Sequence, residues 1–163
     1  MEIVELRPDH WEEVRTIYLH GITTKQATFQ TDAPCWEDWD KGHLSALRYI
    51  AIIDGIVAGW AALSPVSSRC VYAGVAEVSV YIHEGYRGKG VGKALLQKLI
   101  TESETSDIWT LQSGIFPENL ASIALHEKMG FRTIGYREKV AKMDGIWRDT
   151  MLMERRSKIT GQD

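Results

Sequence analysis

The chain has 163 residues, of which 44% are hydrophobic and 25% charged, and its formal net charge is −3. This size fits one domain with a buried core, and the mild acidity argues against non-specific nucleic-acid binding, which needs a basic surface. The two cysteines, Cys35 and Cys70, stand outside any zinc-ligand spacing, so we expect no metal site. Without a signal-peptide pattern or an apolar run near the ~20 residues of a membrane span, we expect a cytoplasmic protein with no membrane partner.

The spacing of apolar residues predicts a mixed α/β fold with several hairpins. The element order is β-α-α-β-β-β-α-β-α-β-β, which differs from the regular alternation of a doubly wound sheet. Asp54-Gly55 and Asp144-Gly145 each join two apolar runs, as is typical of two-residue hairpin turns. In chain order, we expect elements at 3–6, about 10–21, from 34 onward, 49–53, 56–63, 75–82, from 91 onward, 108–115, 119–130, 131–141 and 146–154.

No repeat, linker or shift in composition divides the chain. We therefore expect one domain over residues 1–163, with the polar segment 155–163 as a frayed tail. Between the first two helices, residues 23–33 are polar and contain one isolated aromatic, Phe29, so this segment is expected to be a loop.

A glycine-rich segment, Arg87-Gly88-Lys89-Gly90-Val91-Gly92, follows the strand at 75–82 and leads into a helix. Glycines let the backbone approach a ligand, and free N–H groups at a helix start attract anions. Tyr86 to Ile100 contains four basic residues and no acidic one, which favours a bound phosphate over a flexible turn beside a solvated basic face. The glycine spacing matches neither the P-loop nor the dinucleotide-binding fingerprint. The four basic residues are Arg87, Lys89, Lys93 and Lys98.

The pattern that does fit is [R/Q]-x-x-G-x-[G/A], and with it the sequence resembles the GNAT family of acetyl-CoA-dependent N-acetyltransferases. A second family motif is matched by Pro117 to Ser122 together with Leu125 to Phe131. The segments 76–82, 121–127 and 145–149 resemble the branch that acetylates phosphinothricin and methionine sulfoximine.

The resemblance implies a mostly antiparallel sheet, flanked by helices and split into a V between the strands at 75–82 and 108–115. Acetyl-CoA would enter the split as co-substrate. The strand at 75–82 would bond the pantetheine arm, and the glycine loop would hold the pyrophosphate. The helix at 119–130 would contact the pantetheine or thiol end. The expected cofactor-binding residues are Val80, Tyr81, Ile82, Arg87, Gly88, Lys89, Gly90, Val91, Gly92, Lys93, Asn119 and Ser122.

Acetyl transfer to an amine needs a base, and Glu77 is the candidate because it interrupts the apolar strand 75–82. Partial burial would make this carboxylate a stronger base, and the resemblance implies the same role. The alternative is a carboxylate that simply faces solvent. Many family members have a Tyr general acid on the helix after the glycine loop, but the aligned residue here is Leu96, so the acid is not identified.

The resemblance also points to the acceptor pocket. Phe29 would line its wall, Arg69 would pair with a substrate carboxylate, and Tyr72 would hydrogen-bond the substrate. The alternatives are loop anchoring for Phe29 and solvated positions for Arg69 and Tyr72. His126, one helical turn after Ser122, is expected at the substrate site, with a packed helix histidine as the alternative.

These features predict acetylation of the α-amino group of a small amino-acid-like acceptor such as phosphinothricin, methionine sulfoximine or methionine sulfone. One alternative is acetylation of a protein N-terminus, a lysine or a polyamine. Another is a non-catalytic acyl-CoA-binding domain, which would not need Glu77. Apolar strands near the C-terminus and the branch resemblance favour a homodimer.

Overall fold

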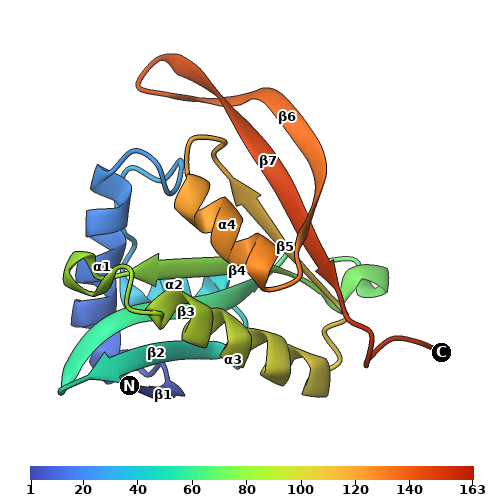
Figure 1. Ribbon diagram of the computed structural model, residues 1–163, viewed down its shortest axis with the longest axis horizontal. Helices are drawn as coiled ribbons and strands as arrows, with labels where there is room; N and C mark the ends of the chain where they lie inside the picture. Colours follow the sequence, from blue (N-terminus) through green and yellow to red (C-terminus); the bar gives the residue numbers. More distant parts are fainter.

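A seven-stranded sheet forms the centre of the molecule, with the strand order β1-β2-β3-β4-β5-β7-β6 (Figure 1). The computed structural model describes residues 1–163. The strands are β1 Glu2–Glu5, β2 Arg48–Ile53, β3 Ile56–Pro65, β4 Val75–Ile82, β5 Thr110–Ile115, β6 Arg132–Met143 and β7 Ile146–Arg156. The helices are α1 Trp11–Thr23, α2 Trp36–Gly42, α3 Val91–Thr105 and α4 Leu120–Lys128, with short 3-10 helices η1 Pro8–His10, η2 Cys70–Tyr72 and η3 Glu84–Tyr86.

The predicted order of elements and the mixed α/β class are confirmed. All neighbouring strands are antiparallel except β4 and β5, which are parallel. Both Asp-Gly turns have the left-handed backbone that two-residue hairpins require, with φ values of 51° and 79° at Asp54 and Gly55 and of 50° and 78° at Asp144 and Gly145. Local turn chemistry thus sets the pairing next to each turn, and bulges shift the register further along both hairpins.

The C-terminal segment differs from the prediction. Strand β7 extends to Arg156 and so includes the first two residues of the expected tail. Ser157 is only 3% exposed, and its side-chain oxygen accepts hydrogen bonds from the N–H groups of Ile159 and Thr160. Residues 155–157 therefore belong to the fold, because β-pairing and buried hydrogen bonds continue past the last apolar residue of the strand.

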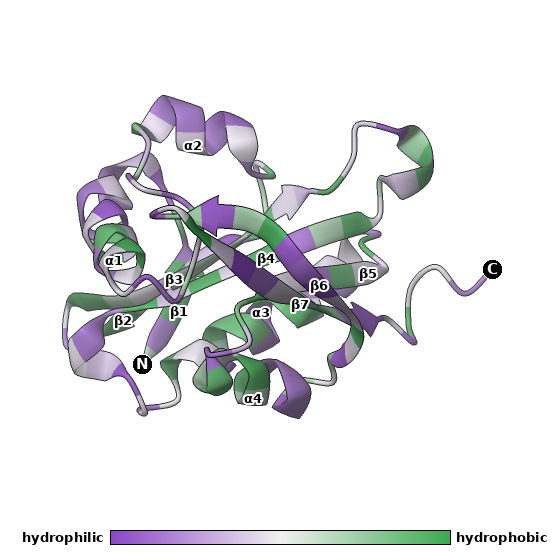
Figure 2. Cartoon of the chain, turned by 90° about the horizontal axis from the view of Figure 1, so that it is seen from above, coloured by the Kyte–Doolittle hydropathy of each residue, from purple (hydrophilic) through white to green (hydrophobic).

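Helices cover both faces of the sheet, and the alternation of side chains along the strands separates two cores. On one face, α1 and α2 pack through Val14, Ile17 and Trp39 against Trp60 of β3. On the other face, α3 packs against the sheet, and its leucines, Leu95, Leu96 and Leu99, are fully buried. Leu96 is therefore a core residue. Figure 2 shows α2 and α4 on opposite sides of the sheet, with the β6–β7 hairpin crossing between them.

The central sheet splits between its parallel strands. β4 pairs with β5 only through Val75, Ala76 and Glu77, which face Thr110, Leu111 and Gln112. Beyond Glu77 the two strands diverge, and Figure 1 shows them separating toward their C-terminal ends. The predicted V-shaped split is confirmed, and it divides the molecule into a β4 arm, comprising β1 to β4 with α1 to α3, and a β5 arm, comprising β5 to β7 with α4.

Candidate active site

A cavity of about 540 Å³ lies at the split. Its lining comes from β4 and β5, from α1 and the loop after it, from α4, and from the β6–β7 hairpin. The cavity therefore joins segments that are far apart in the sequence. The sequence-predicted residues that line it are Phe29, Glu77, Val80, Tyr81, Asn119, Ser122 and His126.

Glu77 lies where β4 and β5 stop pairing. Its carboxylate is exposed and accepts a hydrogen bond from the side-chain amide of Gln112 over 3.4 Å. The partial burial expected from the apolar strand is absent, because the split opens directly at this position. Glu77 shares its face of β4 with Tyr81, which packs against the α1 core, so the carboxylate faces the α1 side of the sheet.

The glycine loop lies outside this cavity, at the start of α3. Gly88 and Gly90 have φ values of +75° and +80°, a left-handed backbone that favours glycine, and Gly90 is the N-cap of α3. Of the loop's backbone N–H groups, five donate to no acceptor. These N–H groups lie at or just before the N-terminus of α3, where the helix dipole favours an anion. These five belong to Gly88, Gly90, Val91, Gly92 and Lys93.

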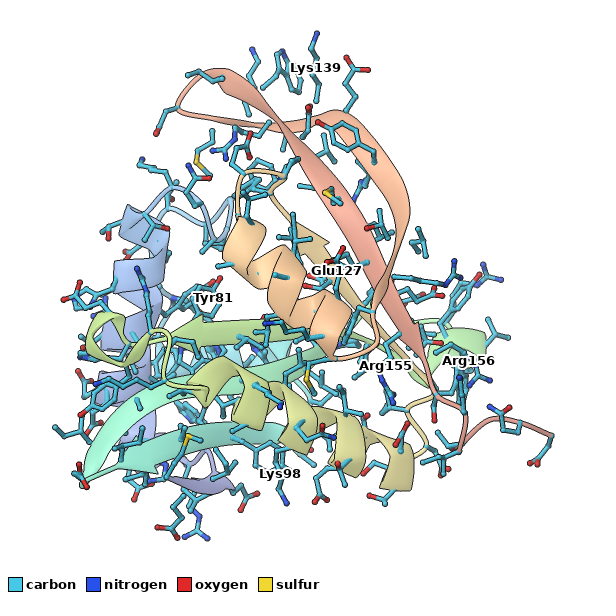
Figure 3. The ribbon with its side chains drawn as sticks, viewed as in Figure 1. Tyr81, Lys98, Glu127, Lys139, Arg155 and Arg156 are labelled. Carbon is cyan, nitrogen blue, oxygen red and sulfur yellow. The ribbon has the colours of Figure 1, made fainter.

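The basic residues of this segment do not all serve that loop. Lys98 pairs with Glu102 over 2.6 Å and lies over the ring of Tyr49. Figure 3 shows Lys98 on the outer side of α3, away from the split. The cations next to the loop are Arg87, Lys89 and Lys93, and Lys89 lies 4.8 Å from the ring centroid of Tyr86.

Strand β4 keeps a free edge toward the split. Val80 pairs with Ala61 and Ile82 with Gly59 on the β3 side, whereas neither pairs with β5. Unpaired backbone groups on a strand edge are a template for another extended chain.

Asn119 and Ser122 lie at the start of α4. The Asn119 side-chain oxygen accepts from the Ser122 N–H over 3.2 Å and caps the helix, while its amide donates to the carbonyl of Gln26 over 3.1 Å. The side chain of Asn119 is therefore already engaged within the protein. The Ser122 hydroxyl lies 3.4 Å from Nδ1 of His126.

His126 is 3% exposed and lines the cavity. Its Nδ1 atom lies 2.7 Å from the carbonyl oxygen of Ser122, and since a carbonyl only accepts, Nδ1 carries the proton in this pair. Nε2 is then an acceptor, and it is buried without a protein partner. Burial lowers the pKa of His126, although the bond to Ser122 opposes this shift. The ring is therefore neutral near pH 7.

Arg69 and Tyr72 are not brought to the cavity. The Arg69 guanidinium lies over the Tyr72 ring at 5.5 Å, and Tyr72 is 44% exposed. In Figure 1, η2, drawn in light green on the right, lies where β4 and β5 start, away from the open end of the split. Within one chain, the path of the loop between β3 and β4 thus keeps both residues from the cavity.

Other residues of the site were missed from the sequence. Arg137 of β6 is the only lysine or arginine that lines the cavity, and its side chain has no hydrogen bond or ion pair. A bulge follows Arg137 and extends to Ala141, and no pattern in the sequence predicts it. Tyr18 lines the cavity beside Tyr81, with ring centroids 4.8 Å apart. Burial raises the pKa of both phenols, so both remain protonated O–H donors at neutral pH.

The structure contains no group of three or more His, Cys, Asp or Glu side chains placed to hold a metal ion. Cys35 and Cys70 are free thiols at the surface. None of the helices combines the length and apolar character that crossing a membrane requires.

Comparison with known proteins agrees with this architecture. The model of the acetyltransferase (GNAT) family matches residues 4–131. YwnH of Bacillus subtilis (strain 168), provisionally described as a phosphinothricin acetyltransferase, is 37% identical over 149 residues, which cover 88% of this chain and 91% of YwnH. The L-methionine sulfoximine/L-methionine sulfone acetyltransferase of Salmonella typhimurium is 34% identical over 101 residues, which cover 62% of this chain and 59% of that protein.

A solved structure is similar over the whole chain. It is yncA of Salmonella typhimurium, provisionally described as an acetyltransferase and solved with its cofactor acetyl-CoA. The match has a TM-score of 0.88 and 25% identity and covers 100% of this chain and 98% of that one. The chain therefore belongs to the GNAT acetyltransferase family, and it is an N-acetyltransferase.

Proposed function

We propose that this enzyme transfers the acetyl group of acetyl-CoA to the α-amino group of a small amino-acid-like acceptor. The observation that carries the proposal is the arrangement around the split. The anion-binding loop begins α3 on one face of the sheet, while Glu77 faces the α1 side. Donor and acceptor would thus meet in the cavity from opposite faces.

The residues present fit acetyl-CoA. Five free N–H groups at the start of α3, with Arg87, Lys89 and Lys93 nearby, suit the pyrophosphate. The unpaired edge of β4 at Val80 and Ile82 suits the amide groups of pantetheine. Acetyl-CoA supplies an acetyl thioester whose carbonyl carbon can be attacked by an amine.

The acceptor side is formed by Glu77, Arg137 and the loop that carries Phe29. Glu77 would accept the proton of the acceptor ammonium, directly or through a water, so that the neutral amine can attack. Arg137 would bind the substrate carboxylate, the role that the sequence assigned to Arg69. A guanidinium suits this role because it can bond both oxygens of a carboxylate. The two cavity phenols, Tyr18 and Tyr81, would supply O–H donors in the same cavity.

The names of the relatives support the acceptor class. YwnH is provisionally described as acting on phosphinothricin, and the Salmonella enzyme is named for methionine sulfoximine and methionine sulfone. All three compounds combine an α-ammonium with a carboxylate. A cavity with one free arginine and one exposed glutamate suits that pair of charges.

One observation favours a different acceptor. A second hollow of about 380 Å³ contains Asp32 and Asp38 and shares Tyr18, Gln30 and His43 with the main cavity. Two carboxylates in a hollow next to the main cavity would favour a cationic acceptor such as a polyamine, a lysine or a protein N-terminus. The non-catalytic alternative receives no support, because the chain belongs to a family of acetyltransferases.

A direct assay tests the proposal. Release of the CoA thiol would be followed with acetyl-CoA and L-methionine sulfone, and in parallel with the decarboxylated amine, spermidine and an alanine-initiated peptide. We expect kcat/KM to be highest for L-methionine sulfone. A preference for spermidine or the peptide would contradict the amino-acid assignment and leave acetyl transfer itself intact.

We further propose that the enzyme is cytoplasmic and forms a homodimer. The β6–β7 hairpin exposes large apolar side chains, including Ile146 at 67% and Trp147 at 52%. Exposed apolar surface of this kind is commonly covered by a second copy. Light scattering after size-exclusion chromatography measures the mass, and a monomer at micromolar concentration would contradict the dimer.

A further inference from the structure

At the open end of the split, strand pairing no longer joins the two arms, because β4 and β5 stop pairing at Glu77. Helix α1 packs on the β4 arm through the core that contains Trp60. The loop that follows α1 carries residues 27–30, all of which line the cavity. The contacts of this loop with the β5 arm therefore determine how the acceptor side is closed.

Arg148 of β7 makes two of the four hydrogen bonds that join this loop to the β5 arm. Its Nη1 donates to the carbonyl of Lys25 over 3.0 Å, and its Nη2 donates to the side-chain oxygen of Gln26 over 3.3 Å. On its own arm, Nη2 also donates to the carboxylate of Glu118 over 3.4 Å. The side chain of Arg148 is 15% exposed. One guanidinium thus bridges the two arms.

The same guanidinium supports the wall of the cavity. It lies 4.1 Å from the ring centroid of Phe116, and Phe116 meets Phe29 edge-on with centroids 4.9 Å apart. Both phenylalanines line the cavity. Arg148 itself does not line it, so its influence on an acceptor would act through these two rings and the loop.

Two neighbouring contacts follow the same route. The Asn119 amide donates to the carbonyl of Gln26 over 3.1 Å, and Lys25 pairs with Asp144 at the hairpin turn over 2.7 Å. The Lys25–Asp144 pair is more than half exposed on both sides and contributes little, whereas the side chain of Arg148 is only 15% exposed. Arg148 is therefore the centre of this bridge.

We propose that Arg148 is a positioning residue that ties the loop after α1 to the β5 arm and thereby sets the size of the acceptor pocket. Its effect on acceptor choice rests on the proposed function, while its effect on the loop does not. An arginine suits this position because its planar fork donates in several directions while its face packs on an aromatic ring. A lysine keeps the charge but lacks the planar fork, so it would not reproduce this set of contacts together.

The test compares Arg148→Met and Arg148→Lys with wild type and with Arg132→Met. Arg132 is an exposed arginine of β6 that pairs with Glu154 over 3.2 Å, so it controls for loss of an ion pair on the same hairpin. The kinetic probes are L-methionine sulfone and the bulkier L-phenylalanine, with acetyl-CoA as donor. Hydrogen–deuterium exchange of residues 24–30 reports the loop without any assay of activity.

For Arg148→Met we expect faster exchange in residues 24–30 and unchanged exchange in α3. The KM for L-methionine sulfone should rise about tenfold, the ratio that corresponds to loss of one charge-assisted contact, and its advantage over L-phenylalanine should shrink. Arg148→Lys should fall between wild type and Arg148→Met, and Arg132→Met should match wild type. Acetyl-CoA affinity should not change.

Unchanged loop exchange in Arg148→Met would overturn the proposal, as would equal losses of kcat/KM for both acceptors. If wild type acetylates neither amino acid, the proposed acceptor class fails. The exchange experiment then still decides whether Arg148 holds the loop.

Discussion

Glu77 and Gln112 form the last paired position between β4 and β5, and the Gln112 amide donates to the Glu77 carboxylate over 3.4 Å. The candidate base is thus fixed at the point where the sheet opens. Its backbone is held by pairing on both sides, with Ser64 of β3 and Gln112 of β5. A carboxylate on such a rigid strand can be presented to the cavity without a mobile loop.

The first prediction concerns this carboxylate. Glu77→Gln keeps the shape and the contact with Gln112 but removes the basic oxygen. We expect kcat to fall by about a hundredfold at neutral pH, a typical contribution of general base catalysis, with acetyl-CoA affinity unchanged. Steady-state kinetics with L-methionine sulfone measures this change.

The pH profile provides the internal check. In the Gln variant, the rate should rise with pH until the acceptor amine loses its own proton. Glu127→Gln is the control, because Glu127 is exposed on α4 and does not line the cavity (Figure 3). A wild-type kcat in Glu77→Gln would assign the deprotonation to another group.

The second prediction concerns the glycine loop. Gly90 has φ +80°, and a Cβ there would meet no protein atom within 4 Å. Gly90→Ala therefore introduces backbone strain, and the added methyl group lies where the pyrophosphate would approach. We expect acetyl-CoA affinity to fall by about tenfold or more, equivalent to 1.4 kcal/mol or above.

Gly55→Ala is the matched control for this effect. Gly55 has φ +79°, also meets nothing within 4 Å, and lies in the turn between β2 and β3. Both variants should lose similar stability, and only Gly90→Ala should lose affinity in calorimetric titration with acetyl-CoA. Equal affinities in the two variants would contradict the anion-binding role of the loop.

Local signals in the sequence were sufficient for most of the fold. The Asp-Gly turns, the glycine loop and the alternation along β4 are each determined by a few adjacent residues, and all three lie where they were expected. Seven of the predicted site residues also line one cavity, because they belong to segments whose order along the chain is typical of the family.

The remaining features depend on long-range geometry. Arg148 and Lys25 are 123 residues apart, and Asn119 and Gln26 are 93 residues apart, so no periodicity relates them. Arg137 reaches the cavity beside a bulge, and Arg69 is kept from it by the path of a loop. Neither feature leaves a pattern in the neighbouring sequence.

The third prediction follows from the buried histidine. Burial lowers the pKa of His126 in the folded protein below the ordinary value of 6.5, so the unfolded chain binds a proton more readily. Its contribution to stability is present above about pH 6.5 and is lost as pH falls through the folded-state pKa. Acidification should therefore destabilise the native state.

Urea unfolding of wild type and His126→Gln at about pH 7.5 and about pH 5.5 measures this linkage. The Gln variant should lose less stability between the two values than wild type. Burial also lowers the pKa of His43, so a residual pH dependence with the same sign should persist in the variant. An identical loss in both proteins would show that His126 does not contribute.

The last prediction concerns the group that holds the acceptor carboxylate. Arg137 lines the cavity that contains Glu77, whereas Arg69 packs on Tyr72 outside it. Arg137→Gln should therefore raise the KM for L-methionine sulfone by about tenfold to a hundredfold, the cost of one lost charge-assisted hydrogen bond. Arg69→Ala should leave this KM near the wild-type value.

Lys139→Gln is the control for the charge of the hairpin, because Lys139 lies two residues away from Arg137 and points outward (Figure 3). The comparison that decides is kcat/KM for L-methionine sulfone against its decarboxylated amine. Arg137→Gln should narrow this ratio, since the amine lacks the carboxylate that the guanidinium would bond, and Lys139→Gln should preserve it. If Arg69→Ala narrows the ratio instead, the acceptor is held by the segment before β4, and Arg137 has no part in recognising it.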